Sequence, residues 1–218
     1  RDARLLLLEE RAAWGDVVAY RPRHDWVREL IIERLGAATL RQHHATLVET
    51  LAAWPIRLGV SARRYVVRHA LHHRAEAGDL AGAWVLAADM SFLEARVREV
   101  GVWETEAELA QLAMHCRAIG DEALRQKFDD LARALVRESH WLHADPEATA
   151  AVLWNRLRRA GWSEHDLSTQ LRVPADTAFL RVRHTATRES PALVRDLVGH
   201  AGDVHACVVT PDGRRVVS

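Results

Sequence analysis

The chain has 218 residues, of which 49% are hydrophobic and 28% are charged. This composition excludes a wholly disordered chain and suffices for one large domain or two small ones. The 30 basic and 30 acidic residues cancel, so no net charge favours nucleic acid or an anionic membrane as partner. No apolar run approaches the length of about 18 residues that a membrane span needs. Cys116 and Cys207 are far apart, which favours a reducing, cytoplasmic compartment over a disulfide framework.

Residues 4–21 predict a β-hairpin. A run of four leucines at 5–8 precedes the turn signal "WGD" at 14–16, and "VVAYR" follows as a second strand. The chain opens with "RDARLLLLEERAAW" and without an initiator Met. We therefore interpret the sequence as an internal piece of a longer protein.

Residues from about 23 to 172 predict successive amphipathic helices with short connections. Apolar residues recur at helical spacing, and caps or breakers separate the runs. The expected helices span about 23–36, 37–54, 61–78, 79–88, 91–100, 104–119, 121–143, 145–161 and 163–171. Antiparallel helices of this kind form a helical bundle or solenoid, and no fixed-period repeat indicates a named repeat class.

Helix ends and buried faces can also be predicted. Ser61 and Ser163 are typical N-caps, Asp145 is expected to cap a helix whose first turn holds Pro146, and Gly161 is expected past its end. Most of the eight tryptophans are expected in the core. Two apolar stripes predict core positions: Leu109, Leu112, Cys116 and Ile119, and then Leu124, Phe128, Leu131, Leu135 and Leu142.

The C-terminal part loses the helical period. Residues 173–192 predict a linker, and "ALVRDLV", "VHACVVT" and "RRVVS" predict three short strands. A turn of Pro211, Asp212 and Gly213 joins the last two. With the Gly199-His200 pair, this stretch resembles the entry to a WD-repeat β-propeller. The resemblance implies a propeller that continues beyond Ser218; the alternative is an isolated hairpin packed on the helices.

The N-terminal part carries a second resemblance. "YRPRHDWVREL" resembles the end of the winged-helix domain of STAND-class NTPases, the NB-ARC relatives that include the apoptosome scaffold and plant resistance proteins. That family carries Met-His-Asp after a β-hairpin, and this chain has Arg23-His24-Asp25. The resemblance implies that His24 contacts the β-phosphate of ADP and that Asp25 supports it and caps the helix. The substitution of Arg for Met at position 23 departs from the family pattern.

The middle of the chain resembles the helical segment between NB-ARC and WD repeats in bacterial members, notably at "RRYVVRHALHHRAEAGDLAGAWVLAADMSFLEARVREVG". The fold expected is mainly α-helical: residues 1–35 end a winged helix, 36–172 form a helical arm, 173–192 a linker, and 193–218 the first propeller strands. The function implied is a regulatory segment that couples a WD-repeat sensor to an ADP/ATP switch. Its partners would be the intramolecular nucleotide-binding domain, the propeller, a ligand or protein sensed by the propeller, and further copies of the chain on activation.

Catalysis by this chain alone is not expected. The sequence has no GxxxxGK[ST] loop to hold phosphates, so ADP or ATP would bind only in a full-length parent, and no cofactor is expected here. A protein-interaction scaffold without a nucleotide role is the alternative.

A metal hydrolase is a third, weaker interpretation, based on "RHALHHR". This stretch places His69, His72 and His73 on one helix, and His69 and His73 stand four residues apart, a spacing that can bind zinc. A third ligand and a catalytic acid are not evident. Packing between helices is the favoured interpretation of these residues and of His43, His44, His140 and His143, so no metal site is predicted. Cys116 beside His115 is expected to be a core cysteine, since neighbours on a helix point apart.

Overall fold

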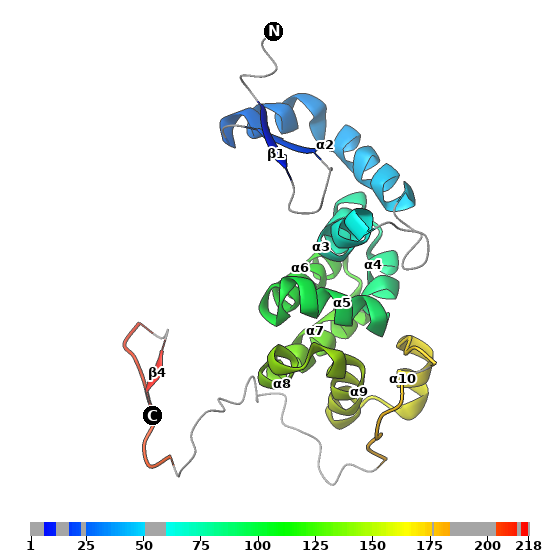
Figure 1. The fold of residues 1–218 in the computed structure, drawn as a ribbon, viewed down its shortest axis with the longest axis vertical. Coiled ribbons are helices and arrows are strands. Elements are labelled where there is room, and N and C mark those ends of the chain that lie inside the picture. Colours follow the sequence, from blue (N-terminus) through cyan, green and yellow to red (C-terminus); the bar gives the residue numbers. More distant parts are fainter. Residues whose placement is uncertain are drawn as a thin grey trace.

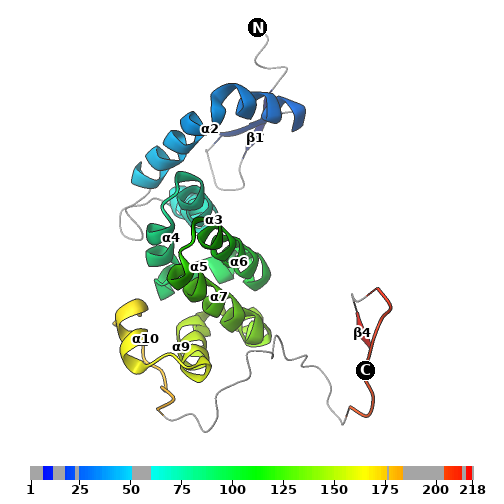
Figure 2. The same cartoon turned by 180° about the vertical axis from the view of Figure 1, so that it is seen from behind.

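The computed structural model describes residues 7–11, 18–22, 25–50, 60–175, 177–183, 204–212 and 215–217. Within these ranges the protein is mainly helical, as predicted, and the helices follow one another along the long axis of the molecule (Figure 1; Figure 2 from behind). Among the described residues, no helix combines the length and the apolar character needed to cross a bilayer.

The predicted N-terminal hairpin is present. Strand β1 (Leu7–Arg11) pairs antiparallel with β2 (Val18–Pro22), with Leu7 opposite Pro22 and Arg11 opposite Val18. Residues 5, 6 and 17 of the two predicted strands lie outside the described residues. Helix α2 (Asp25–Thr50) starts close behind β2 and is interrupted at Gly36, whose φ of 72° lies in the left-handed region that glycine tolerates. The break predicted at Gly36 is therefore confirmed.

The apolar stripe at the start of α2 is not covered by the described parts of the chain. Val27 is buried, but Trp26 is 58% exposed, and Leu30, Ile31 and Leu35 are exposed as well. Trp103 and Trp141 are also exposed, so the expectation that most tryptophans lie in the core was wrong for these three. Periodicity identifies the apolar side of a helix, but a packing partner decides whether that side is buried.

The other helices form one packed stack. They are α3 (Val60–Ala77), α4 (Leu80–Ala87), α5 (Met90–Val100), α6 (Val102–Ile119), α7 (Glu122–Arg137), α8 (Ser139–Ala144), the 3-10 turn η1 (Pro146–Ala148), α9 (Thr149–Ala160) and α10 (Glu164–Gln170). The predicted helix 121–143 was wrong in one respect, because it is divided at Glu138 into α7 and α8.

Short polar side chains begin many of these helices. Asp79, Asp89 and Asp121 each accept a hydrogen bond from the first turn of α4, α5 and α7. Ser163 and Asp166 form a reciprocal capping box at α10. Asp145 caps η1 and Pro146 follows it, as predicted. The cap predicted at Ser61 was wrong, because α3 begins at Val60 and Ser61 lies inside the helix.

One continuous core joins α3 to α10. All members of the stripe from Leu124 to Leu142 are buried, and Trp84 of α4 meets the ring of Phe128 edge to face at 5.5 Å. Ile119 was predicted to be buried but is 68% exposed. It is the last residue of α6, where the following Gly120 turns the chain away in the left-handed conformation.

A buried arginine connects three helices of this core. Arg96 of α5 is only 3% exposed. Its guanidinium forms an ion pair with Glu108 of α6 and donates to the backbone carbonyls of Val67 and Arg68 of α3, at 2.5 and 2.9 Å. A charge at this depth requires such partners.

Part of the predicted linker is attached to the helices. Asn155 of α9 donates to the carbonyl of Leu180 and accepts the N–H of Val182, each at 2.8 Å. The guanidinium of Arg181 lies 4.4 Å from the centre of the Trp154 ring. Residues 177–183 have no helix or strand, as predicted, but they lie along α9.

The C-terminal strands form a small hairpin. Strand β3 (Val208–Val209) pairs antiparallel with β4 (Val216–Val217), and all four valines are exposed. The hairpin predicted around the Pro-Asp-Gly turn is confirmed. A propeller is not present in the described residues, and the segment "ALVRDLV" lies outside them.

We expect Leu135→Ala to lower the free energy of unfolding by about 2–5 kcal/mol, because Leu135 is fully buried in α7 and its truncation leaves a cavity. Ile119→Ala is the matched control and should change it by less than about 0.5 kcal/mol. Urea titration of each variant measures both values, and equal losses would contradict the burial described here.

Removal of Arg96 should be costly for an electrostatic reason. Arg96→Met leaves the Glu108 carboxylate without its partner and should cost about 3 kcal/mol or more of unfolding free energy. The double variant Arg96→Met with Glu108→Leu removes both charges and should recover a large part of this loss. A double-mutant cycle in urea measures the coupling, and strictly additive losses would count against a buried pair.

Candidate functional site

The residues predicted to bind nucleotide are only partly described. His24 lies outside the described residues. Asp25 is the exposed first residue of α2, where a carboxylate interacts favourably with the positive end of the helix dipole. Contact of these residues with ADP stays a prediction.

The residues predicted to belong to a WD repeat are likewise divided. Gly199, His200 and Gly213 lie outside the described residues, whereas Pro211 and Asp212 form the turn between β3 and β4. The hydroxyl of Thr210 donates to the Asp212 carboxylate at 2.5 Å and accepts the N–H of Arg215 at 3.0 Å. These bonds close the turn, which is what a hairpin between two short strands requires.

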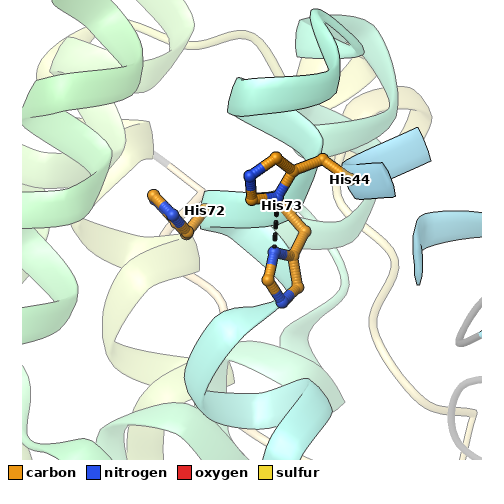
Figure 3. A group of neighbouring side chains, drawn as sticks. All are labelled: His44, His72 and His73. Atoms are coloured by element: carbon orange, nitrogen blue, oxygen red, sulfur yellow. Dashed lines mark hydrogen bonds between the residues drawn. The ribbon is translucent and has the colours of Figure 1, made fainter. Parts of the chain in front are cut away.

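Among the described residues, a group of three potential metal ligands lies where α2 crosses α3. His44 comes from the part of α2 that follows the Gly36 break, and His72 and His73 come from α3 (Figure 3). His73 is buried, His44 is half-buried and His72 is exposed. Each offers a ring nitrogen, and the three nitrogens lie within 4.8 Å of one another.

Hydrogen bonds orient the buried member of this histidine cluster. The Nδ1 atoms of His44 and His73 are 2.9 Å apart and share one hydrogen (Figure 3). The other ring nitrogen of His73, Nε2, is 2.7 Å from the hydroxyl of Tyr65. His72 stands beside them, with its ring centre 5.6 Å from that of His44. The ring of His73 is therefore held from both sides.

The surroundings favour the neutral form of His44 and of His73. Burial, followed by the nearby rings of His44, His72 and His69, lowers the pKa of His73 to about 4. Burial and the neighbouring His72 also lower the pKa of His44. Burial raises the pKa of Tyr65, which stays a neutral phenol. Lone pairs on imidazole nitrogen are consequently available at this crossing.

A cleft adjoins the cluster. It has a volume of about 430 Å³ and lies between α3 and α6, and His72 forms part of its wall. Apolar groups of Leu71, Leu112 and Met114 line it together with the carboxylates of Glu76 and Glu108. Met114 is otherwise exposed, so the cleft offers an apolar surface beside two acidic groups.

The Cys116–His115 pair carries no nucleophilic chemistry. Cys116 is fully buried in the core and His115 is exposed, as their neighbouring positions on a helix predicted. Burial raises the pKa of the Cys116 thiol, which makes it less reactive. The prediction of a core cysteine is confirmed.

The sequence indicated part of the histidine cluster and favoured packing between helices over a metal site for its members. It drew attention to His69 and His73, whereas the structure groups His73 with His72 and His44. His44 lies 29 positions before His73, and nothing in the local pattern reveals that α2 folds back onto α3.

Comparison of the chain with protein-family models, curated proteins and solved structures gave no significant match. The resemblance of the sequence to STAND-class NTPases therefore stays a prediction, and function has to be argued from residues and their contacts.

The histidine cluster should make the protein less stable in mild acid. An unfolded histidine takes up a proton near pH 6.5, but folded His73 does so only near pH 4. Between these values the unfolded state binds more protons, so the stability present above pH 6.5 declines as the pH falls towards 4, by at most about 3 kcal/mol from this residue. Urea midpoints measured in EDTA at pH 7.5 and pH 5 test this.

The variant His73→Gln removes the titrating group and keeps a polar side chain at the site. Its urea midpoint should depend less on pH over the same interval than that of the unaltered chain. Equal pH dependence in the two proteins would contradict the assignment.

Proposed function

We propose that this chain is a non-catalytic regulatory segment of a STAND-type signalling NTPase, in which a helical arm couples a WD-repeat sensor to an ADP/ATP switch. The carrying observation is a single continuous core from α3 to α10, with a β-hairpin before the helices and another after them. A packed helical stack is stiff enough to transmit a displacement between two attached modules.

The N-terminal arrangement supports this role. The hairpin β1–β2 is followed after two residues by α2, which is the order of elements in which the family carries its His-Asp pair. His24 and Asp25 stand at this junction in the sequence. A switch of this kind would use His24 to hold the β-phosphate of ADP in the closed state.

The C-terminal connection supports it as well. Asn155 holds residues 180 and 182 by two hydrogen bonds, and Arg181 stacks over Trp154. The chain that leads to β3 is thus anchored to α9 rather than leaving the arm at once. Movement of the C-terminal module would then pull on α9 and, through the shared core, on the helices before it.

A protein-interaction scaffold is the second candidate. The cleft between α3 and α6 favours it, since Met114 is exposed there beside Leu71 and Leu112. An exposed methionine next to an apolar hollow is a common surface for binding a partner. In this case the helices would present surfaces without any nucleotide.

The two functions differ in whether nucleotide is retained. We expect the parent polypeptide, expressed from its native coding sequence, to copurify with ADP at about one molecule per chain. His24→Ala should release this ADP, because the contact to the β-phosphate is lost. It should also raise the basal signalling activity of the parent protein. His43→Ala, a second histidine replaced early in the chain, is the matched control and should retain ADP. Liquid chromatography of the denatured protein measures the nucleotide.

Each outcome has a distinct meaning. A parent without bound ADP, in which added ADP does not bind either, would overturn the switch and favour the scaffold. If both variants retain ADP, the proposed switch stands, but His24 is not part of the ADP-binding site.

A further inference from the structure

We propose that His44, His72 and His73 form a zinc-binding site that links α2 to α3. This site does not depend on the proposed signalling role. It rests on the one place in the described residues where three such ligands from two helices gather.

The ligand chemistry selects the metal. Three neutral imidazoles are borderline-soft nitrogen donors, which suit zinc and other late first-row metals and are poor ligands for magnesium or calcium. Zinc accepts three protein ligands and a fourth from water in a tetrahedral arrangement. Glu76 follows His72 by one turn and lines the same cleft, so a carboxylate lies near the cluster.

The geometry needs only small movements of side chains. Zinc–nitrogen bonds of about 2.0–2.1 Å place tetrahedral ligand nitrogens about 3.3 Å apart. The Nδ1 atoms of His44 and His73, now 2.9 Å apart, would separate by a few tenths of an ångström. The most distant pair of nitrogens lies within 4.8 Å and would approach. His72 is exposed and His44 half-buried, so both rings have room to turn.

An outer partner for the buried ligand is already in place. If Nδ1 of His73 binds the metal, Nε2 carries the hydrogen and donates it to Tyr65, which lies 2.7 Å away. A ligand histidine normally donates its second ring N–H to an oxygen in this way, which fixes its tautomer and its direction. Tyr65 is half-buried on α3, two turns before His73, and packs its ring against that of His73.

Zinc bound between α2 and α3 would stabilise the packing of these two helices. Of the residues of α2, only Val27 is buried, so the crossing of α2 with α3 has little buried apolar surface. In the absence of metal, the hydrogen bond between His44 and His73 is a polar link at this crossing. Zinc would replace it by coordinate bonds from both helices and would hold α2 in one orientation on the stack.

The test uses the untagged 218-residue chain, because a polyhistidine tag would itself bind zinc. The protein is freed of metal with EDTA and dialysed against buffered zinc chloride, and bound zinc is measured by mass spectrometry. We expect one zinc per chain. At about a hundredfold excess of free zinc over the Kd, the melting temperature should rise by roughly 5 °C. Cobalt(II) should bind at the same site with the visible absorption of tetrahedral coordination.

Matched variants distinguish a specific zinc site from nonspecific zinc binding by surface histidines. His44→Gln and His72→Gln should lose stoichiometric zinc and the thermal shift; His72 is exposed and His44 is only partly buried, so these variants should fold. His43→Gln, beside His44, and His69→Gln, one turn from His73, should keep both. Tyr65→Phe should weaken binding about tenfold or more.

Less than one zinc per chain in the unaltered protein would overturn the site. So would equal zinc binding by His44→Gln, or equal losses in the His43→Gln and His69→Gln controls, which would mean adventitious chelation by surface histidines.

Discussion

The burial of Arg96 is the constraint on which the centre of the molecule depends. A guanidinium that is 3% exposed is tolerated only if nearly all of its charge is met by the protein. Glu108 of α6 and two carbonyls of α3 meet it, so the positions of α3, α5 and α6 are set together. The apolar core alone would allow these helices to slide, because hydrophobic contacts are non-directional. The ion pair and the hydrogen bonds have direction and therefore define one arrangement.

The positions of α3, α5 and α6 determine where the cleft and the histidine cluster lie. Glu108 reaches the cleft between α3 and α6, and His72 forms another part of the same wall. Next to this wall, His73 is turned towards α2, where it meets His44. The histidine cluster and the cleft are thus two consequences of how α3 is held. Replacement of Arg96 would therefore disturb both the cleft and the histidine cluster, although Arg96 belongs to neither.

The two connections of the helical stack differ in kind. The contact of α2 with α3 includes the hydrogen bond between His44 and His73, which should respond to protons and would respond to a metal ion. The attachment of residues 177–183 to α9 depends on an amide side chain and on stacking over Trp154, which are insensitive to pH near neutrality. If the arm transmits movement, pH or a metal ion would therefore change the contact between α2 and α3. The attachment of residues 177–183 to α9 would stay the same.

Much of the local structure could be predicted from the sequence. Apolar spacing identified most of the helices, short polar residues and glycines identified their ends, and both hairpins followed from their turn residues, because these features depend on neighbours a few positions away. The sequence could not predict which apolar faces would be covered, as Trp26 and Ile119 demonstrate, since burial depends on a partner elsewhere in the chain. It also could not bring His44 to His73 or Glu108 to Arg96. Those pairs exist only because distant helices pack against each other, and the tertiary structure alone decided them.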